Sequence, residues 1–262
     1  MKKIIVFILV FAVFQNCSTT SPSTAVKTKN EKKKNSKSEE VDEYFEPEFE
    51  ILQNKIYDKD IRTVRAHKTN WEMSNPAIEH NSKDKITFSF DKIGDNLGDY
   101  YYTIVHCNAD WKKSNLQEIN YLEGFFQDFM NNYSFSFNTY AHYVHYEINI
   151  PNRSMKIKET GNYIFKVFKD NDPEKVVLTK RFIVYENKII TRGKVKRPSQ
   201  VGERNYKQEV DFELDLQKLV IRDIGEDLKV VVQQNNRWDN AITDLKPLFI
   251  RGNQLIYDYN NE

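Results

Sequence analysis

The sequence predicts an all-β fold, with an immunoglobulin-like antiparallel sandwich at residues 46–186 and a second, incomplete β domain at residues 187–262. Apolar and polar residues alternate along most of the chain beyond residue 60, which is the period of half-buried strands. About seven such strands within roughly 125 residues are typical of an antiparallel sandwich. Between Tyr100 and Tyr146, 14 of 47 residues are Phe, Tyr or Trp, against 13% for the whole chain. Aromatic side chains bury large areas, so this stretch must form a core, a sugar platform or a docking face.

The first residues predict a signal peptide at residues 1–16. Lys2 and Lys3 precede an uncharged apolar run from Ile4 to Phe14, which is too short to span a bilayer. Cys17 follows at a position that resembles the acylated Cys of bacterial lipoproteins, although the residues just before it depart from the usual pattern. We therefore expect lipidation of Cys17. The alternative is an ordinary signal peptide with an incidental Cys.

Residues 17–45 are expected to form the lipid-anchored Cys and a flexible linker. The segment is rich first in Ser and Thr, then in Lys, then in Asp and Glu, and it has too few apolar residues to build a core. A coil of this length reaches about 30 Å, which would hold a folded body away from a membrane. The Lys run could also touch anionic lipid, but a solvated tether is the preferred interpretation.

Charge and cysteine content argue against two classes of protein. The chain has 39 basic and 38 acidic residues, and removal of Lys2 and Lys3 with the leader would leave 37 − 38 = −1. This balance leaves no excess of positive charge that could bind nucleic acid, so no nucleic-acid partner is expected. With Cys17 acylated, Cys107 would be the one free thiol, and an intrachain disulfide could not form.

Within the expected sandwich, two residues are predicted to be structural. Gly161 and Asn162 form a turn before Tyr163, which resembles the tyrosine corner of immunoglobulin-like domains. Trp111 follows an Asx-type turn at residues 108–110 and is expected to cap the core. The expected strands lie near residues 61–67, 86–91, 100–107, 145–150, 163–167 and 176–185.

A short helix, or helical excursion, is expected between two of these strands. Ser114 and Gln117 match a capping box. Gly124 weakens this helix by about 1 kcal/mol. Apolar residues recur at helical spacing, at Leu116, Ile119, Leu122, Phe126 and Phe129.

The second domain is expected to contain about four strands. From Tyr206 to Leu216, one set of alternate residues is mostly apolar and the other is charged, which indicates a strand with a charged outer face. Residues 228–235 and 254–259 are expected to add two more strands. Because the chain stops beside a strand, we expect the native protein to continue beyond Glu262.

No constellation of residues predicts catalysis, a metal or a cofactor. His142 and His145 would point to opposite faces of a strand, which disfavours chelation by the pair. His106 and Cys107 are sequence neighbours on a strand, so their side chains diverge, and no second Cys of the folded part completes a zinc site. We therefore expect no catalytic residue, cofactor, metal ion or small-molecule substrate.

The loop at residues 233–240 is a candidate contact surface, with Arg237 and Trp238 as the candidate partner-contact residues. Arg and Trp are common anchors of protein interfaces. The aromatic residues between Tyr100 and Tyr146 leave a second interpretation open, in which they form a platform that stacks on glycans. A hydrolase or metalloenzyme is the third possibility, and no sequence motif supports it.

Several short motifs in order resemble the plug protein of the Bacteroidota type IX secretion system, a family first catalogued as a domain of unknown function. The resemblance covers about residues 55–262. It implies a non-catalytic protein that closes the periplasmic opening of the outer-membrane translocon β-barrel when no substrate passes. It also implies a location on the periplasmic face of the outer membrane, to which the Cys17 lipid would anchor the protein. The alternative is a periplasmic or surface glycan-binding lipoprotein with an immunoglobulin-like fold. The motifs are HCNADW at 106–111, YLEGF at 121–125, NTYAHYVHY at 138–146 with Ser136, IPN at 150–152, GNYIFKV at 161–167, LTKRFIV at 178–184, QEVDF at 208–212, QNNRWDNA at 234–241 and LIYDY at 255–259.

Overall fold

The computed structural model describes residues 52–258. The expected signal peptide (1–16), the lipidation site at Cys17, the linker to residue 45 and the first residues of the expected sandwich lie outside the described residues. Residues 259–262 lie outside them too. Neither α-helix in the described part of the chain has the length or the apolar content needed to cross a membrane.

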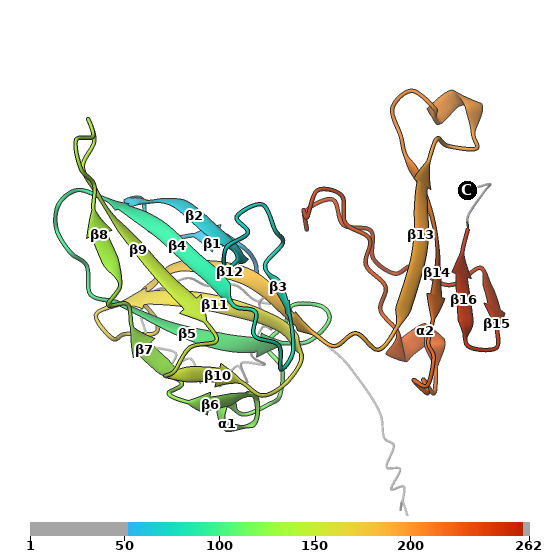
Figure 1. The fold of residues 1–262 in the computed structure, drawn as a ribbon, viewed down its shortest axis with the longest axis horizontal. Coiled ribbons are helices and arrows are strands. Elements are labelled where there is room, and N and C mark those ends of the chain that lie inside the picture. Colours follow the sequence, from blue (N-terminus) through green and yellow to red (C-terminus); the bar gives the residue numbers. More distant parts are fainter. Residues whose placement is uncertain (1–51, 259–262) are drawn as a thin grey trace, which may run out of the picture. The chain divides into compact units, whose positions relative to one another are not determined.

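Two antiparallel sheets form the first β unit (Figure 1). The first sheet has the order β1-β12-β11-β5-β7, and β3 pairs in parallel with β12. The second sheet has the order β2-β4-β9-β8. The strands of the first sheet are β1 (Lys55–Ile56), β3 (Ala77–Glu79), β5 (Tyr100–Cys107), β7 (Gln127–Phe129), β11 (Gly161–Lys169) and β12 (Val176–Tyr185). Those of the second are β2 (Ile61–Lys68), β4 (Ile86–Ile93), β8 (Tyr133–Phe135) and β9 (Tyr143–Ile150), and a separate ribbon pairs β6 (Leu122–Gly124) with β10 (Met155–Ile157).

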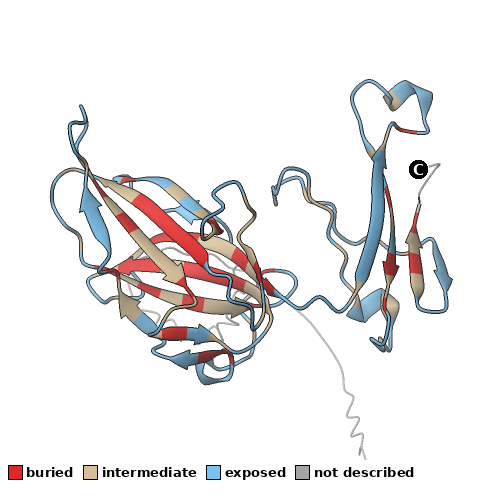
Figure 2. Ribbon diagram, in the orientation of Figure 1, coloured by how far each residue is buried: buried red, intermediate tan, exposed pale blue. Residues whose placement is uncertain are grey.

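The core of this unit lies between its two sheets. Phe88 on β4 stacks on Phe165 on β11 with ring centroids 4.1 Å apart. Phe90 on β4 stacks on Tyr146 on β9 at 5.1 Å, and Tyr100 on β5 meets both of these rings edge-on. Figure 2 shows the buried residues following the central strands of both sheets. The expected all-β sandwich is confirmed.

The expected helix is much shorter than its apolar spacing indicates. Only Glu118–Tyr121 is helical (α1), and the chain is already extended at Leu122. Ser114 does not cap this helix, because its hydroxyl lies 2.8 Å from His106 Nδ1 and the N-cap residue is Gln117. Leu122 and Phe129 lie instead in strands β6 and β7, because the partner strands β10 and β5 are available to bond their backbone.

A single four-stranded antiparallel sheet forms the second unit, with the order β13-β14-β16-β15. Its strands are β13 (Ile190–Lys196), β14 (Glu209–Asp215), β15 (Phe249–Arg251) and β16 (Gln254–Tyr257), and the chain also forms η1 (Val201–Glu203) and α2 (Ile224–Asp227). The prediction of a strand at residues 228–235 is wrong. Three consecutive Val residues favour a strand, but the only ladder contact there is one bridge between Val232 and Ile242. Strand propensity has no effect without a partner strand.

Candidate functional site

Most of the aromatic residues between Tyr100 and Tyr146 fall into a buried group and an exposed group. Tyr100, Tyr102, Tyr121 and Tyr146 are each at most 2% exposed and belong to the sandwich core. The other group is exposed, and it lies in the loop between β6 and β7 and in the hairpin of β8 and β9. Its members are Phe125, Phe126, Tyr133, Phe135, Phe137 and Tyr140. The segment is therefore partly core and partly surface.

The turn after β5 places Trp111 against the sandwich. The side-chain oxygen of Asn108 accepts hydrogen bonds from the backbone N–H groups of Asp110 and Lys112, each at 3.0 Å. This Asx-type turn carries Trp111 at a φ of 62°. Its indole is 4% exposed and packs in a small cluster with Cys107 and Ile164.

His106 and Cys107 do not form a catalytic pair. The ring of His106 uses both nitrogens, with Nδ1 2.8 Å from Ser114 Oγ and Nε2 3.1 Å from the carbonyl oxygen of Thr160. Cys107 points the other way and is 1% exposed. Burial raises the pKa of its thiol to about 12, so the thiol is protonated at neutral pH.

Tyr163 lies in the core, next to a turn that requires glycine. Its ring is fully buried, and its hydroxyl donates to the carbonyl oxygen of Glu159 at 2.7 Å. Gly161 has a φ of +146°, and a Cβ there would lie 2.4 Å from His106 Nε2. The arrangement has the features of a tyrosine corner, in which the hydroxyl ties the start of a strand to the preceding turn.

Arg181 on β12 lies between two tryptophan rings. Its guanidinium carbon is 4.3 Å from the ring centroid of Trp111 and 5.3 Å from that of Trp238. The two indoles meet edge-on with centroids 4.8 Å apart. Nε and Nη2 of Arg181 also donate to the carbonyl oxygen of Leu52, at 2.8 and 2.6 Å. We call these three residues, Trp111, Arg181 and Trp238, the Trp–Arg–Trp cluster.

The two candidate contact residues therefore lie in different surroundings. Trp238 is half-buried in the Trp–Arg–Trp cluster, whereas Arg237 is exposed and its guanidinium pairs with Asp239. The sequence pattern did not indicate Arg181. A single Arg within a strand does not reveal that its guanidinium will stack against tryptophan rings distant in sequence.

His142 and His145 each pair with a different carboxylate. Nδ1 of His142 lies 2.8 Å from Asp95, and Nδ1 of His145 lies 2.6 Å from Asp91 on β4. His145 belongs to β9, whereas His142 precedes that strand. Each imidazole is thus held by its own aspartate.

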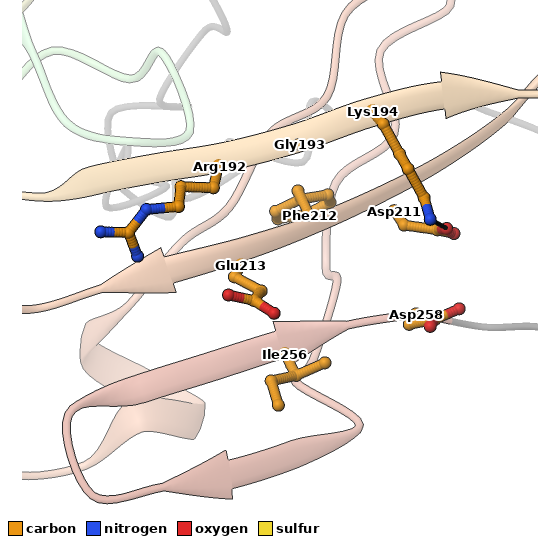
Figure 3. A pocket seen from close by; sticks show the side chains of 8 residues that line it. All are labelled: Arg192, Gly193, Lys194, Asp211, Phe212, Glu213, Ile256 and Asp258. Atoms are coloured by element: carbon orange, nitrogen blue, oxygen red, sulfur yellow. Dashed lines mark ion pairs between the residues drawn. The ribbon is translucent and has the colours of Figure 1, made fainter.

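An open hollow of about 400 Å³ lies on the charged face of the second sheet (Figure 3). Lys194 on β13 is in register with Asp211 on β14, and Figure 3 shows its ammonium reaching that carboxylate, 3.8 Å away. Arg192 is in register with Glu213, but its guanidinium points away from the other side chains. Such cross-strand pairs of opposite charge stabilise a sheet, so the hollow is the surface of an ion-pair ladder.

One end of this ladder has three clustered carboxylates. Oxygens of Glu209, Asp211 and Asp258 lie within 4.8 Å of one another. The ammonium of Lys196 is 3.0 Å from Glu209 and 2.7 Å from Asp211. These two carboxylates raise the pKa of Lys196. One ammonium of the chain itself, that of Lys196, therefore offsets part of the negative charge of the three carboxylates.

Comparison with known proteins identifies the first unit. Residues 61–186 match the family model described as "Type 9 secretion system plug protein 1st domain". A crystal structure of a hypothetical protein from Parabacteroides merdae ATCC 43184 is similar over 79% of this chain, with 32% sequence identity and a TM-score of 0.74. The match covers 52% of that protein, so the chain spans about half the length of this solved relative. No curated protein matches the chain.

Proposed function

Because the chain belongs, through residues 61–186, to the type IX secretion system plug protein family, we propose that it closes the periplasmic opening of the outer-membrane translocon when no substrate is being transported. The family match is the observation that carries this proposal. The expected partner is the translocon β-barrel. A wide pore that stayed open between substrates would leak solutes across the outer membrane, so the plug must bind whenever the pore is empty.

We infer that the protein acts by binding and performs no catalysis. The two side chains that most resemble catalytic groups, His106 and Cys107, support this inference. Both ring nitrogens of His106 face partners within the fold, and the buried thiol of Cys107 stays protonated at neutral pH. Their surroundings suit packing, since a reactive cysteine needs an accessible thiolate.

The location proposed with this function is the periplasmic face of the outer membrane, with a lipid on Cys17 as the anchor. The sequence pattern at residues 1–17 supports it. In a strain that lacks the translocon barrel, Cys17→Ser should release the protein into the soluble periplasm. Undiminished membrane retention of the variant in that strain would contradict the anchor.

Affinity purification from native membranes tests the proposed partner. The full chain should co-purify with the outer-membrane barrel, and the yield should fall when the barrel is occupied by substrate. Cells without the protein should still secrete but become sensitive to large antibiotics that the outer membrane normally excludes. Normal permeability together with no captured barrel would contradict the plug function.

A second candidate function, glycan binding, is favoured by one observation. Phe137 is 93% exposed, and the Tyr140 side chain is fully exposed. Exposed rings can stack on sugars, but they serve protein interfaces equally well. Binding of the purified protein to a panel of periplasmic and surface glycans would support this alternative.

A further inference from the structure

The segment around β8 and the start of β9 differs from the rest of the chain in its charge. Charged residues make up 29% of the sequence, yet residues 129–146 contain no Lys, Arg, Asp or Glu. Their two histidines, His142 and His145, already pair with aspartates. The segment instead combines Phe and Tyr with Ser, Asn and Thr. The segment has no formally charged residue of its own, and the charged groups paired with it are Asp91 and Asp95 at its two histidines.

Four aromatic side chains of this segment are exposed, and two of them extend the sandwich core. In register, Tyr133 lies opposite the buried Tyr146 and Phe135 lies opposite the buried Val144. Residues paired in this way share a face of the sheet, so Tyr133 and Phe135 lie on the core-facing side. Their side chains are nevertheless 42% and 53% exposed. Together with the still more exposed Phe137 and Tyr140, they form what we call the aromatic edge.

The backbone of β8 is accessible for pairing as well. β8 is the last strand of its sheet, and among the described residues only β9 pairs with it. Figure 1 shows β8 and the turn that joins it to β9 at one end of the sandwich, and Figure 2 shows β8 exposed. A free strand edge without charged residues to block it is a template for an added strand.

We propose that the aromatic edge docks an extended, uncharged segment of a protein partner, which adds a strand beside β8 and packs on the exposed rings. Such strand addition draws affinity from main-chain hydrogen bonds and specificity from side chains. The proposal rests on the plug function only in naming the partner, which would be a strand or turn of the translocon barrel.

The charge of the segment argues for this occupant. Residues 129–146 disfavour a charged partner segment, because a charge buried against their uncharged side chains would be unpaired. Attraction to anionic lipid needs Lys or Arg, and residues 129–146 have neither. A mixture of Tyr, Ser and Asn with a few large rings is instead the composition of protein-binding loops.

The area of the aromatic edge fits the centre of an interface. Aromatic side chains bury about 150–250 Å² each. At the exposures found, the four rings offer on the order of 600 Å², against about 800 Å² on each side of a standard interface. The rings would therefore serve as anchors, with further contacts supplied by the surrounding surface.

Site-specific photo-crosslinking in the full chain tests the proposal. Benzoylphenylalanine would replace Phe137 in one strain and Phe249 in another. Phe249 is a matched control, because it is exposed on the edge strand β15 of the other sheet. We expect at least ten-fold more crosslinking to the barrel from position 137, with the crosslinked peptide mapping to an uncharged strand or turn.

A matched pair of variants gives the second measurement. The triple variant Phe135→Ser, Phe137→Ser, Tyr140→Ser should lower barrel co-purification about ten-fold, whereas Phe249→Ser with Ile250→Ser should leave it unchanged. The thermal midpoint of each variant checks folding, and Phe137→Ser alone, at a fully surface position, serves if the triple variant is unstable.

The outcomes separate this proposal from the plug function. If the wild-type chain captures the barrel and the aromatic variants capture it equally well, the docking site is wrong and the plug function stands. If the wild-type chain captures no barrel, the plug function and this partner both fall. Crosslinks from position 137 only to lipid, to glycan or to a second copy of the chain would also overturn the proposal.

Discussion

The sandwich and the second sheet bury their apolar residues in different ways. In the sandwich, two facing sheets enclose a core of 22 buried hydrophobic residues. In the second unit, a single sheet is covered on one face by α2 and irregular chain, and its core contains four buried residues. Large apolar side chains such as Val220, Phe249 and Ile250 stay exposed there.

The difference shows how each unit obtains its stability. A sheet needs a second layer to bury a full face, and the sandwich has one. In the second unit the other face carries the in-register ion pairs of β13 and β14, in which the exposed ammonium of Lys194 meets the largely buried carboxylate of Asp211. Ion pairs that remain open to solvent on one side contribute little, about 0–1 kcal/mol each when exposed, which is far less than a buried aromatic ring. Substitutions should therefore have larger effects in the sandwich than in the second sheet.

Substitution of Tyr163 should give the largest change in the free energy of unfolding. Tyr163→Ala vacates a fully buried site, and we expect it to lower the free energy of unfolding by about 3–5 kcal/mol. Tyr163→Phe keeps the ring but loses the hydrogen bond to Glu159, so it should cost only about 1 kcal/mol. Urea unfolding of the three proteins measures both values, and equal stability of all three would contradict a structural role.

A pair of leucines compares the two units directly. Leu178 in the sandwich is 1% exposed and Leu255 in the second sheet is 0% exposed. Leu178→Ala should cost about 3–4 kcal/mol and Leu255→Ala about 2–3 kcal/mol, because the thinner layer around Leu255 can collapse into the space. Thermal and urea unfolding of both variants provide the test. An equal or larger loss at Leu255 would mean that the second unit is packed as tightly as the sandwich.

The Trp–Arg–Trp cluster links the segment around residue 238 to the sandwich, and its energy should be smaller. Trp238→Ala should lower stability by about 1–2 kcal/mol, since it removes one ring contact with Trp111 and one cation–π contact with Arg181. A double-mutant cycle of Trp238→Ala with Arg181→Ala isolates the coupling between them. Purely additive effects would mean that the two side chains do not stabilise each other.

Lowering the pH should produce the smallest loss of unfolding free energy, and it should do so in both units. Burial raises the pKa of Asp58, but hydrogen bonds from Lys169 and from the backbone N–H of Asp60 outweigh it, so the pKa lies below the ordinary value of 3.8. The resulting stability is present above pH 3.8 and is lost as the pH falls through the lowered value. The pKa of Glu209 in the second sheet is also lowered, chiefly by the backbone N–H of Ser199 and then by Lys196.

Asp58→Asn and Glu209→Gln should therefore each flatten the fall of unfolding free energy with acid. Lys169→Met should reproduce the result of Asp58→Asn, because it removes the strongest of the hydrogen bonds that lower that pKa. Urea unfolding between pH 2 and pH 6 measures these slopes. A wild-type slope in Asp58→Asn would show that its carboxylate does not contribute.

Much of the sandwich could be predicted from the sequence alone. Alternation placed β4, β9 and β11 correctly, because successive side chains of a strand point to opposite faces, and the apolar set turns towards the core. The turn at Asn108 could also be read locally, since an Asx turn involves only neighbouring residues. The family resemblance, carried by ordered short motifs, agrees with the match over residues 61–186.

Tertiary structure alone decided the rest. The apolar spacing from Leu116 to Phe129 predicts a helix, but Leu122 and Phe129 pair with strands distant in sequence, and only Glu118–Tyr121 is helical. The Val-rich segment after Leu228 has strand propensity, but no strand lies beside it. The cation–π contact of Arg181 with Trp238 joins residues that are distant in sequence and is formed only when the chain folds. Likewise, the aromatic residues between Tyr100 and Tyr146 became core or surface according to whether a second sheet faces them. Local sequence determines the period of each segment, whereas burial and pairing depend on which distant segments the fold brings opposite it.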